Sequence, residues 1–195
     1  MCTMTEVSAL TGRLLVATPR LADPNFERAV VFLLDHHRKG SLGVVLNRPT
    51  AVDVGDVLQP WAPLAVAPGV VFEGGPVSLD SALGLAVVPG GPGADGEAGP
   101  LGWRRVHGAI GLVDLEAPPE LLAAELGSLR IFAGYAGWGP GQLDRELAAG
   151  AWYLVESEPG DLSAPDPERM WRAVLRRQRG KLAMVATYPD DPSLN

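Results

Sequence analysis

The chain has 195 residues, a formal net charge of −7 and a hydrophobic fraction of 47%. That length allows one domain or a tight pair, and it is enough to bury a core. The acidic balance disfavours nucleic-acid binding, which depends on cations meeting phosphates. The single cysteine excludes an internal disulfide, and no apolar run approaches the roughly 18 residues that a membrane helix needs. The first ten residues also lack a secretory-signal pattern, so we expect a cytoplasmic protein without membrane contact.

Apolar runs of strand length recur along the chain, partly β-branched and bounded by Gly, Pro, Asp or Asn. They predict strands at residues 14–18, 30–35, 42–47, 70–73, 83–88, 109–113, 129–135, 151–155 and 182–187. The segment 30–34 is apolar throughout, which predicts a strand covered on both faces.

Helices are fewer and gather in the second half of the chain. A short helical turn is expected after Asp53, and longer helices are expected at residues 119–126, 140–149 and 167–179. Asp166 is the predicted N-cap of the last of these, and Gly150 is the predicted left-handed stop of the one before it. Three leucines of the first long helix are expected to face inward: Leu121, Leu122 and Leu126.

Strand-rich stretches come first and helices cluster later, which favours an α+β fold over a doubly wound sheet. We expect one domain over residues 1–195, with a frayed start at residues 1–8. The segment 89–100 has eight Gly or Pro in twelve positions, and it predicts a mobile surface loop rather than a domain linker. The oligomeric state is left open.

The stretch "GYAGWGPGQLDREL" at residues 134–147 is the most unusual of the chain. Its first and third glycines have the spacing of a phosphate-binding P-loop, but Pro140 and Gly141 stand where Lys and Ser or Thr are needed. The dinucleotide fingerprint also fails, so no cofactor is expected. Two interpretations remain: a turn whose aromatics pack on the sheet, or a turn that borders a binding site at a helix N-terminus.

The sequence offers no familiar catalytic or metal-binding pattern. No serine lies in a G-x-S-x-G elbow, and the chain has only three histidines, two of them adjacent. We therefore predict no catalytic set and no metal site. An enzyme with an unfamiliar site near Glu73, His36 and Arg48 is kept as an alternative.

A second alternative is a transcriptional regulator that contacts DNA through the arginines of residues 169–179. Any solvated helix face has a similar pattern, and the acidic chain argues against this interpretation.

Five separated motifs carry a family resemblance. They are "FERAVVFLLDH" (26–36), "GVVLNRP" (43–49), "GGPV" (74–77), "GYAGWGPGQLDREL" (134–147) and "AW" (151–152). In order and spacing they resemble the YqgE/AlgH family of bacterial proteins, over nearly the whole chain. The resemblance implies a bent, bulged mixed β-sheet that curls into a partial barrel, with helices packed outside. It implies no particular activity, although some members are labelled transcriptional regulators.

The motif positions at strand ends and turns supply the candidate binding residues, because such places usually carry function. They are Arg28, Asn47, Arg48, Tyr135, Trp138 and Gln142. Our hypothesis is that the turns at 47–48 and 135–142 border one cleft for a small polar ligand or a protein partner. In it, Arg48 and Gln142 supply hydrogen bonds and Trp138 an apolar wall. The sequence thus favours a non-enzymatic binding protein with a regulatory role.

Overall fold

The computed structural model describes residues 9–90 and 99–190. The expected frayed start at residues 1–8, and residues 91–98 of the expected glycine- and proline-rich loop, lie outside this range.

Ten strands account for most of the regular structure in the described residues. They are β1 (Leu14–Ala17), β2 (Val30–His37), β3 (Gly40–Val45), β4 (Pro49–Asp53), β5 (Val70–Glu73), β6 (Val77–Val87), β7 (Trp103–His107), β8 (Ile110–Val113), β9 (Ser128–Trp138) and β10 (Trp152–Val155). The α-helices are α1 (Val54–Val57), α2 (Gln142–Ala148), α3 (Met170–Arg176) and α4 (Lys181–Val185). Four 3₁₀ turns complete the set: η1 (Gln59–Leu64), η2 (Pro119–Leu121), η3 (Pro159–Ser163) and η4 (Pro167–Arg169).

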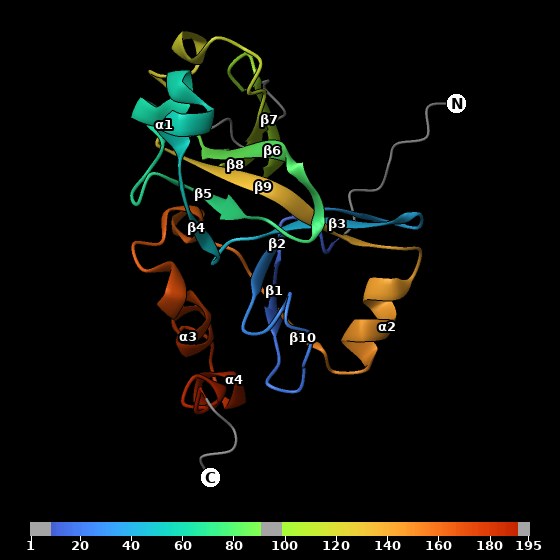
Figure 1. Cartoon of the computed structure of the whole chain (residues 1–195). Coiled ribbons are helices and arrows are strands. Elements are labelled where there is room, and N and C mark those ends of the chain that lie inside the picture. The colour runs from blue at the N-terminus through green and yellow to red at the C-terminus, as the bar shows by residue number, and fades with distance from the viewer. Residues whose placement is uncertain (1–8, 91–98, 191–195) are drawn as a thin grey trace, which may run out of the picture.

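The strands form one mixed, bent sheet in the order β10-β1-β2-β3-β9-β6-β8-β7 (Figure 1). Its pairings are antiparallel except that β5, which also pairs with β4, runs parallel to β9. The register shifts between Leu33 and Asp35 and between Val77 and Ala82, and such bulges increase local twist. The expected α+β fold, a bulged mixed sheet curled into a partial barrel with helices outside, is therefore confirmed.

Residues 30–34 of strand β2 are buried on both faces, as their unbroken apolar run predicts. Phe32 belongs to a core cluster that includes Trp171 of α3, whereas Val31 belongs to a cluster that includes Leu143 of α2. Neighbouring strand residues point to opposite faces, so α3 and α2 cover opposite sides of this part of the sheet. Figure 1 shows the two helices on either side of β1, β2 and β10.

Most predicted strands are confirmed, but two predictions about the later elements are wrong. The segment 182–187, predicted as a strand, lies mostly in helix α4. The helix predicted at 119–126 is only the 3₁₀ turn η2 followed by turns, and Leu121 is 51% exposed rather than facing inward. Strands β4 and β7 were not predicted.

The predicted caps at Asp166 and Gly150 are confirmed, and Asp53 caps the short helix expected after it. The Asp53 and Asp166 carboxylates accept hydrogen bonds from the backbone N–H groups of Gly55 and Arg169. Gly150 adopts the left-handed conformation, with φ 76°, just after α2. Over the described residues, no helix combines the length and the apolar character needed to cross a bilayer.

Candidate functional site

In the glycine-rich turn between β9 and α2, the polar groups of Gln142 form hydrogen bonds within the turn and with helix α2. The side-chain oxygen of Gln142 accepts a hydrogen bond from the backbone N–H of Gly139, at 3.0 Å. Its side-chain nitrogen donates to Oε1 of Glu146, at 2.9 Å. Gln142 is exposed at the surface, but both ends of its amide are engaged within the turn and α2.

Trp138 lies inside an aromatic cluster and is 6% exposed. Its ring stacks on Phe26 with 6.2 Å between centroids, and it meets Trp152 edge-on at 6.1 Å. The indole N–H groups of Trp138 and Trp152 both donate to Oε2 of Glu146, at 3.0 and 2.8 Å. Glu146 was not among the predicted residues, although its position four residues after Gln142 places the two on one helix face.

Asn47 fixes the segment that precedes β2. Its side-chain oxygen accepts from the backbone N–H of Val30, and its side-chain nitrogen donates to the carbonyl of Arg28, both at 2.9 Å. Arg28 has a φ of 52°, which is uncommon for a residue other than glycine. The asparagine thus holds Arg28 in a backbone conformation that sets the direction of its side chain.

The other two candidates contribute to packing and local bonding. The Arg48 Nη2 group donates to the carbonyl of Glu27, at 2.9 Å. Tyr135 is half-buried against the main core, and its backbone pairs with Val77 of β6. The candidates therefore divide into two groups that meet at residues 26–28, since Phe26 contacts Trp138 while Glu27 and Arg28 contact Arg48 and Asn47.

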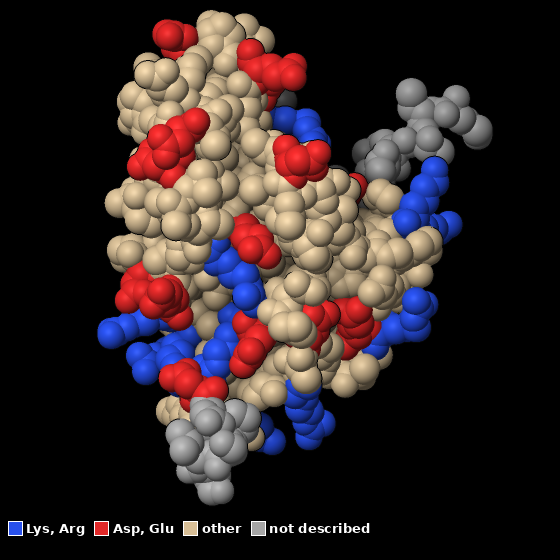
Figure 2. Space-filling view, viewed as in Figure 1, with Lys and Arg blue, Asp and Glu red and all other residues tan. Residues whose placement is uncertain are grey.

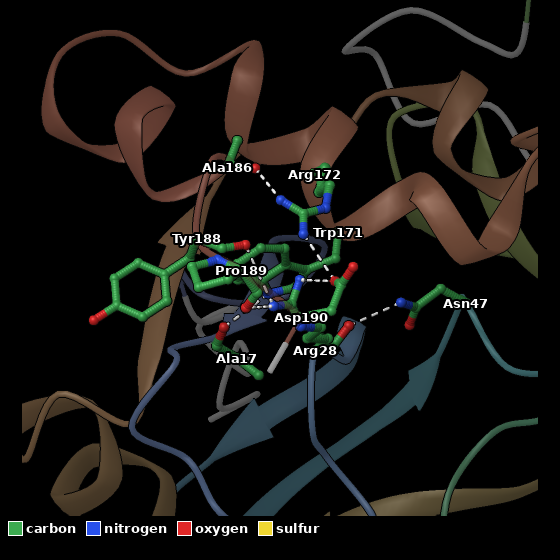
Figure 3. Close-up of polar contacts among 9 residues, drawn as sticks. All are labelled: Ala17, Arg28, Asn47, Trp171, Arg172, Ala186, Tyr188, Pro189 and Asp190. Atoms are coloured by element: carbon green, nitrogen blue, oxygen red, sulfur yellow. Dashed lines mark hydrogen bonds and ion pairs between the residues drawn. The ribbon is translucent and has the colours of Figure 1, made fainter. Parts of the chain in front are cut away.

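A cavity of about 270 Å³ lies on the Arg28 side of this junction. It is lined by Thr18, Pro19, Leu21, Ala22, Glu27, Arg28, Trp171, Tyr188, Pro189 and Asp190. The Arg28 guanidinium lies 4.6 Å from the centre of the Trp171 ring, and the Trp171 indole N–H donates to the buried carbonyl of Ala17 at 2.9 Å. Figure 3 shows these groups converging between β2 and the C-terminal helices. Of the six candidates, Arg28 is the one that lines this cavity.

Two arginines hold Pro189 and Asp190 at the cavity. The Asp190 carboxylate lies 3.0 Å from Nη1 of Arg28 and 2.8 Å from Nη2 of Arg172 (Figure 3). Arg28 also donates to the carbonyl of Pro189, and Arg172 donates to that of Ala186. The hydrogen bond from Arg172 and the charges of Arg172 and Arg28 hold the pKa of Asp190 below its ordinary value.

The comparisons with known proteins cover almost the whole chain. The sequence model of the AlgH-like family matches residues 14–183. The chain is 82% identical over 192 residues to a UPF0301 protein of Streptomyces coelicolor, with 98% of each chain covered. The chain belongs to the AlgH-like family.

Two solved structures show the same fold at lower identity. A crystal structure of a Corynebacterium diphtheriae protein gives a TM-score of 0.85 at 31% identity, with 93% of each chain covered. The solution structure of the AlgH protein from Pseudomonas aeruginosa gives 0.64 at 26% identity, covering 98% of this chain and 100% of the other. The fold of this AlgH-like chain is therefore that of its family.

Of the three residues of the enzymatic alternative, Glu73 and Arg48 are bonded to each other through their backbones, whereas His36 has other partners in this AlgH-like protein. Glu73 donates its backbone N–H to the carbonyl of Arg48 at 2.8 Å. His36 instead lies 2.6 Å from the Ser41 hydroxyl through Nδ1 and 3.8 Å from the Asp144 carboxylate through Nε2. Ser41 is buried within β3. Within residues 9–90 and 99–190, no three His, Cys, Asp or Glu side chains are placed to hold a metal ion.

The arginines proposed to contact DNA are largely engaged with acidic groups. Arg169 pairs with Asp166, Arg172 with Asp190, and Arg177 with the buried Asp161. The hydrogen bonds that Arg177 donates to the Asp161 carboxylate raise the pKa of Arg177 above its ordinary value. Figure 2 shows blue and red side chains interleaved around the C-terminal helices rather than a field of one sign.

Proposed function

We propose that this protein is a non-enzymatic binding protein of the cytoplasm, and that its ligand site is the cavity lined by Arg28 and Trp171. A fixed guanidinium on the wall of a partly apolar hollow is the observation that carries the proposal. A ligand site typically combines apolar walls with a few placed polar groups, and this cavity has both. The lone cysteine of the chain supports the proposed location.

Arg28 is suited to orient a small polar ligand or a partner group. Its side chain is only 27% exposed, its backbone is held by Asn47, and its guanidinium lies against an indole ring. A guanidinium held in this way loses little further freedom on binding, so its donors act with a small entropic cost. A ligand with a carbonyl, carboxylate or phosphate oxygen fits these donors.

Thermal-shift measurement against a panel of metabolites and nucleotides tests the proposal. A ligand of the native state raises its stability, by about 2.7 kcal/mol at one hundred times Kd. We expect a compound that stabilises the wild-type protein to lose this effect on Arg28→Met. The matched control is Arg104→Met, since Arg104 lines a second cavity, of about 430 Å³, formed by other residues. Stabilisation that is equal in the wild type and Arg28→Met would contradict the proposal.

The geometry at His36 supports an enzymatic alternative. A histidine between a serine hydroxyl and a carboxylate is the arrangement that activates serine nucleophiles, although here the carboxylate is 3.8 Å from the ring. Hydrolysis of a p-nitrophenyl ester by the wild type that disappears in Ser41→Ala would favour this function. Equal rates for the two proteins would remove it.

A further inference from the structure

The C-terminal segment Tyr188–Asp190 contacts the cavity as a peptide ligand would. The carbonyls of Tyr188 and Pro189 both accept from Nη2 of Arg28, the former at 3.5 Å. The carboxylate that follows them reaches both Arg28 and Arg172. Peptide carbonyls and an acidic side chain are thus recognised together by one pair of arginines.

The two arginines in this contact are less exposed to solvent than the Asp190 carboxylate that they bind. The side chains of Arg28 and Arg172 are 27% and 24% exposed, whereas that of Asp190 is 83% exposed. Both guanidinium groups lie near the Trp171 ring, at 4.6 and 5.9 Å from its centre. Ion pairs with an exposed partner contribute little to stability, so the carboxylate can leave while the arginines stay in place.

We propose that the Arg28–Arg172 pair is a binding site for an acidic peptide segment of a partner protein, and that Asp190 occupies it as an internal competitor. This inference rests on the proposed function for the location of the site and adds the class of its ligand. The recognised unit is a carboxylate that directly follows two peptide carbonyls.

The charge pattern favours a peptide over a simple anion. Asp190 meets two cations, yet Glu27 also lines the cavity and would repel an isolated anion of high charge. A peptide brings a single carboxylate to the arginines and places neutral backbone in the remaining space. When Asp190 occupies the site, a partner cannot bind there. The apparent affinity for the partner is therefore the intrinsic affinity multiplied by the fraction of molecules in which the site is empty.

Direct titration of the full-length protein tests this. The probe is the acetylated, amidated, fluorescent peptide Ala-Thr-Tyr-Pro-Asp, which repeats residues 186–190. We expect Asp190→Asn to bind it about fivefold more tightly than the wild type, because the internal carboxylate no longer competes. Asp80→Asn, which neutralises another exposed carboxylate, is the matched control and should bind as the wild type does. A probe ending in asparagine should bind none of the three proteins.

The outcomes separate this inference from the proposed function. Equal affinity of Asp190→Asn and the wild type for the acidic probe overturns the peptide assignment, even if small ligands still stabilise the protein through Arg28. Succinate that binds Asp190→Asn as tightly as the peptide does also overturns it, in favour of a small organic acid. The Asp190→Asn/Arg172→Met variant should lose the tighter binding of the acidic probe that Asp190→Asn shows. That loss, with an unchanged circular dichroism spectrum, supports the arginine pair as the site.

Discussion

At the scale of single residues, Glu146 organises the surroundings of the glycine-rich turn. One carboxylate accepts from the indole N–H groups of Trp138 and Trp152 and from the amide of Gln142, at 2.8–3.0 Å. Hydrogen bonds to a charged acceptor are stronger than neutral ones, and removing the acceptor leaves buried donors without partners. The aromatic cluster thus depends on a residue that is itself half-buried.

We expect Glu146→Ala to lower the free energy of unfolding by about 2–3 kcal/mol, because both indole N–H groups lose their acceptor. Glu146→Gln keeps an oxygen at the same place and should lose less than half as much. Urea denaturation followed by tryptophan fluorescence measures both, with the exposed Glu125→Ala as control. If Glu146→Ala is no less stable than Glu125→Ala, the carboxylate has no organising role.

Arg130 is a buried cation without an acidic partner in the described structure. It is 2% exposed, its guanidinium lies 4.3 Å from the centre of the Phe72 ring, and Nη2 donates to the carbonyl of Ala67 at 3.0 Å. Its Nε and Nη1 atoms have no hydrogen-bond partner among the described residues. Burial lowers the pKa of Arg130 to about 10, because the charged form is disfavoured away from water.

The lowered pKa means that folding is opposed by the charge of Arg130 at every pH below about 10. The opposition is relieved only as the pH rises from there towards the ordinary pKa of an arginine side chain. Arg130→Met fills the space without a charge. We therefore expect its free energy of unfolding at pH 7 to lie within about 1 kcal/mol of that of the wild type. Arg130→Ala should lose about 3 kcal/mol, because it also leaves a cavity. Urea denaturation distinguishes them, and equal losses in the two variants would show that the charge itself is required.

The sequence could point to the site residues but not to their partners. Arg28 and Asn47 stand out as polar residues at motif positions beside a buried strand. The contact between Arg28 and Asp190 joins positions 162 residues apart, and no local pattern predicts such a pairing. Trp138 was expected beside a cleft, because a tryptophan next to glycines suits either a binding surface or a core. Only the positions of Phe26 and Trp152 show that it is packed.

At the scale of elements, two glycines of the stretch 134–147 that lie within strand β9 have different requirements. Gly134 has a φ of 70°, and a Cβ there would lie 2.7 Å from the carbonyl oxygens of Gly75 and Val77. Gly137 does not have a positive φ, and the nearest atom to its Cβ would be Cε2 of Tyr135 at 3.8 Å. Gly134 is therefore needed for the close passage of β9 beside the Gly75–Val77 segment, whereas Gly137 is not needed for space.

This difference gives a matched pair of substitutions within β9. We expect Gly134→Ala to lower the free energy of unfolding by about 3 kcal/mol or more, from strain and overpacking against backbone. Gly137→Ala should stay within about 0.5 kcal/mol of the wild type or stabilise it, since alanine restricts the unfolded chain. Thermal unfolding of the two variants measures the difference. Similar melting temperatures would show that strand β9 adapts to a side chain at either position and that Gly134 is not required for close packing.

The errors in predicting the segment 182–187 and strand β7 have physical causes. The run at 182–187 is short and apolar, and such runs do not distinguish a strand from a buried helix. In the structure it follows α3 closely and packs on it as α4, with Leu182 and Val185 against the main core. Strand β7 has two arginines among five residues, so its pairing with β8 is set by the sheet rather than by its own composition.

At the scale of the whole molecule, strand β9 joins two parts of the sheet, β10-β1-β2-β3 on one side and β6-β8-β7 on the other. It pairs with β3 through Ala136–Trp138, with β6 along most of its length, and with β5. The largest core cluster also contains residues from both parts, including Leu14 of β1, Leu85 of β6 and Leu175 of α3. Each part also has a smaller core cluster of its own, but this largest cluster crosses the junction, so we expect the chain to unfold as a single cooperative unit.

Leu175→Ala tests this cooperativity from one end of the molecule. Leu175 is fully buried, and its truncation should lower the free energy of unfolding by about 3 kcal/mol. Because β9 links the parts, far-ultraviolet circular dichroism and tryptophan fluorescence should shift together to a lower urea midpoint with an unchanged m-value. The exposed Leu121→Ala is the control and should move the midpoint little. Two separated transitions in Leu175→Ala, with the β6-β8-β7 part persisting to higher urea, would show that the chain contains two units rather than one domain.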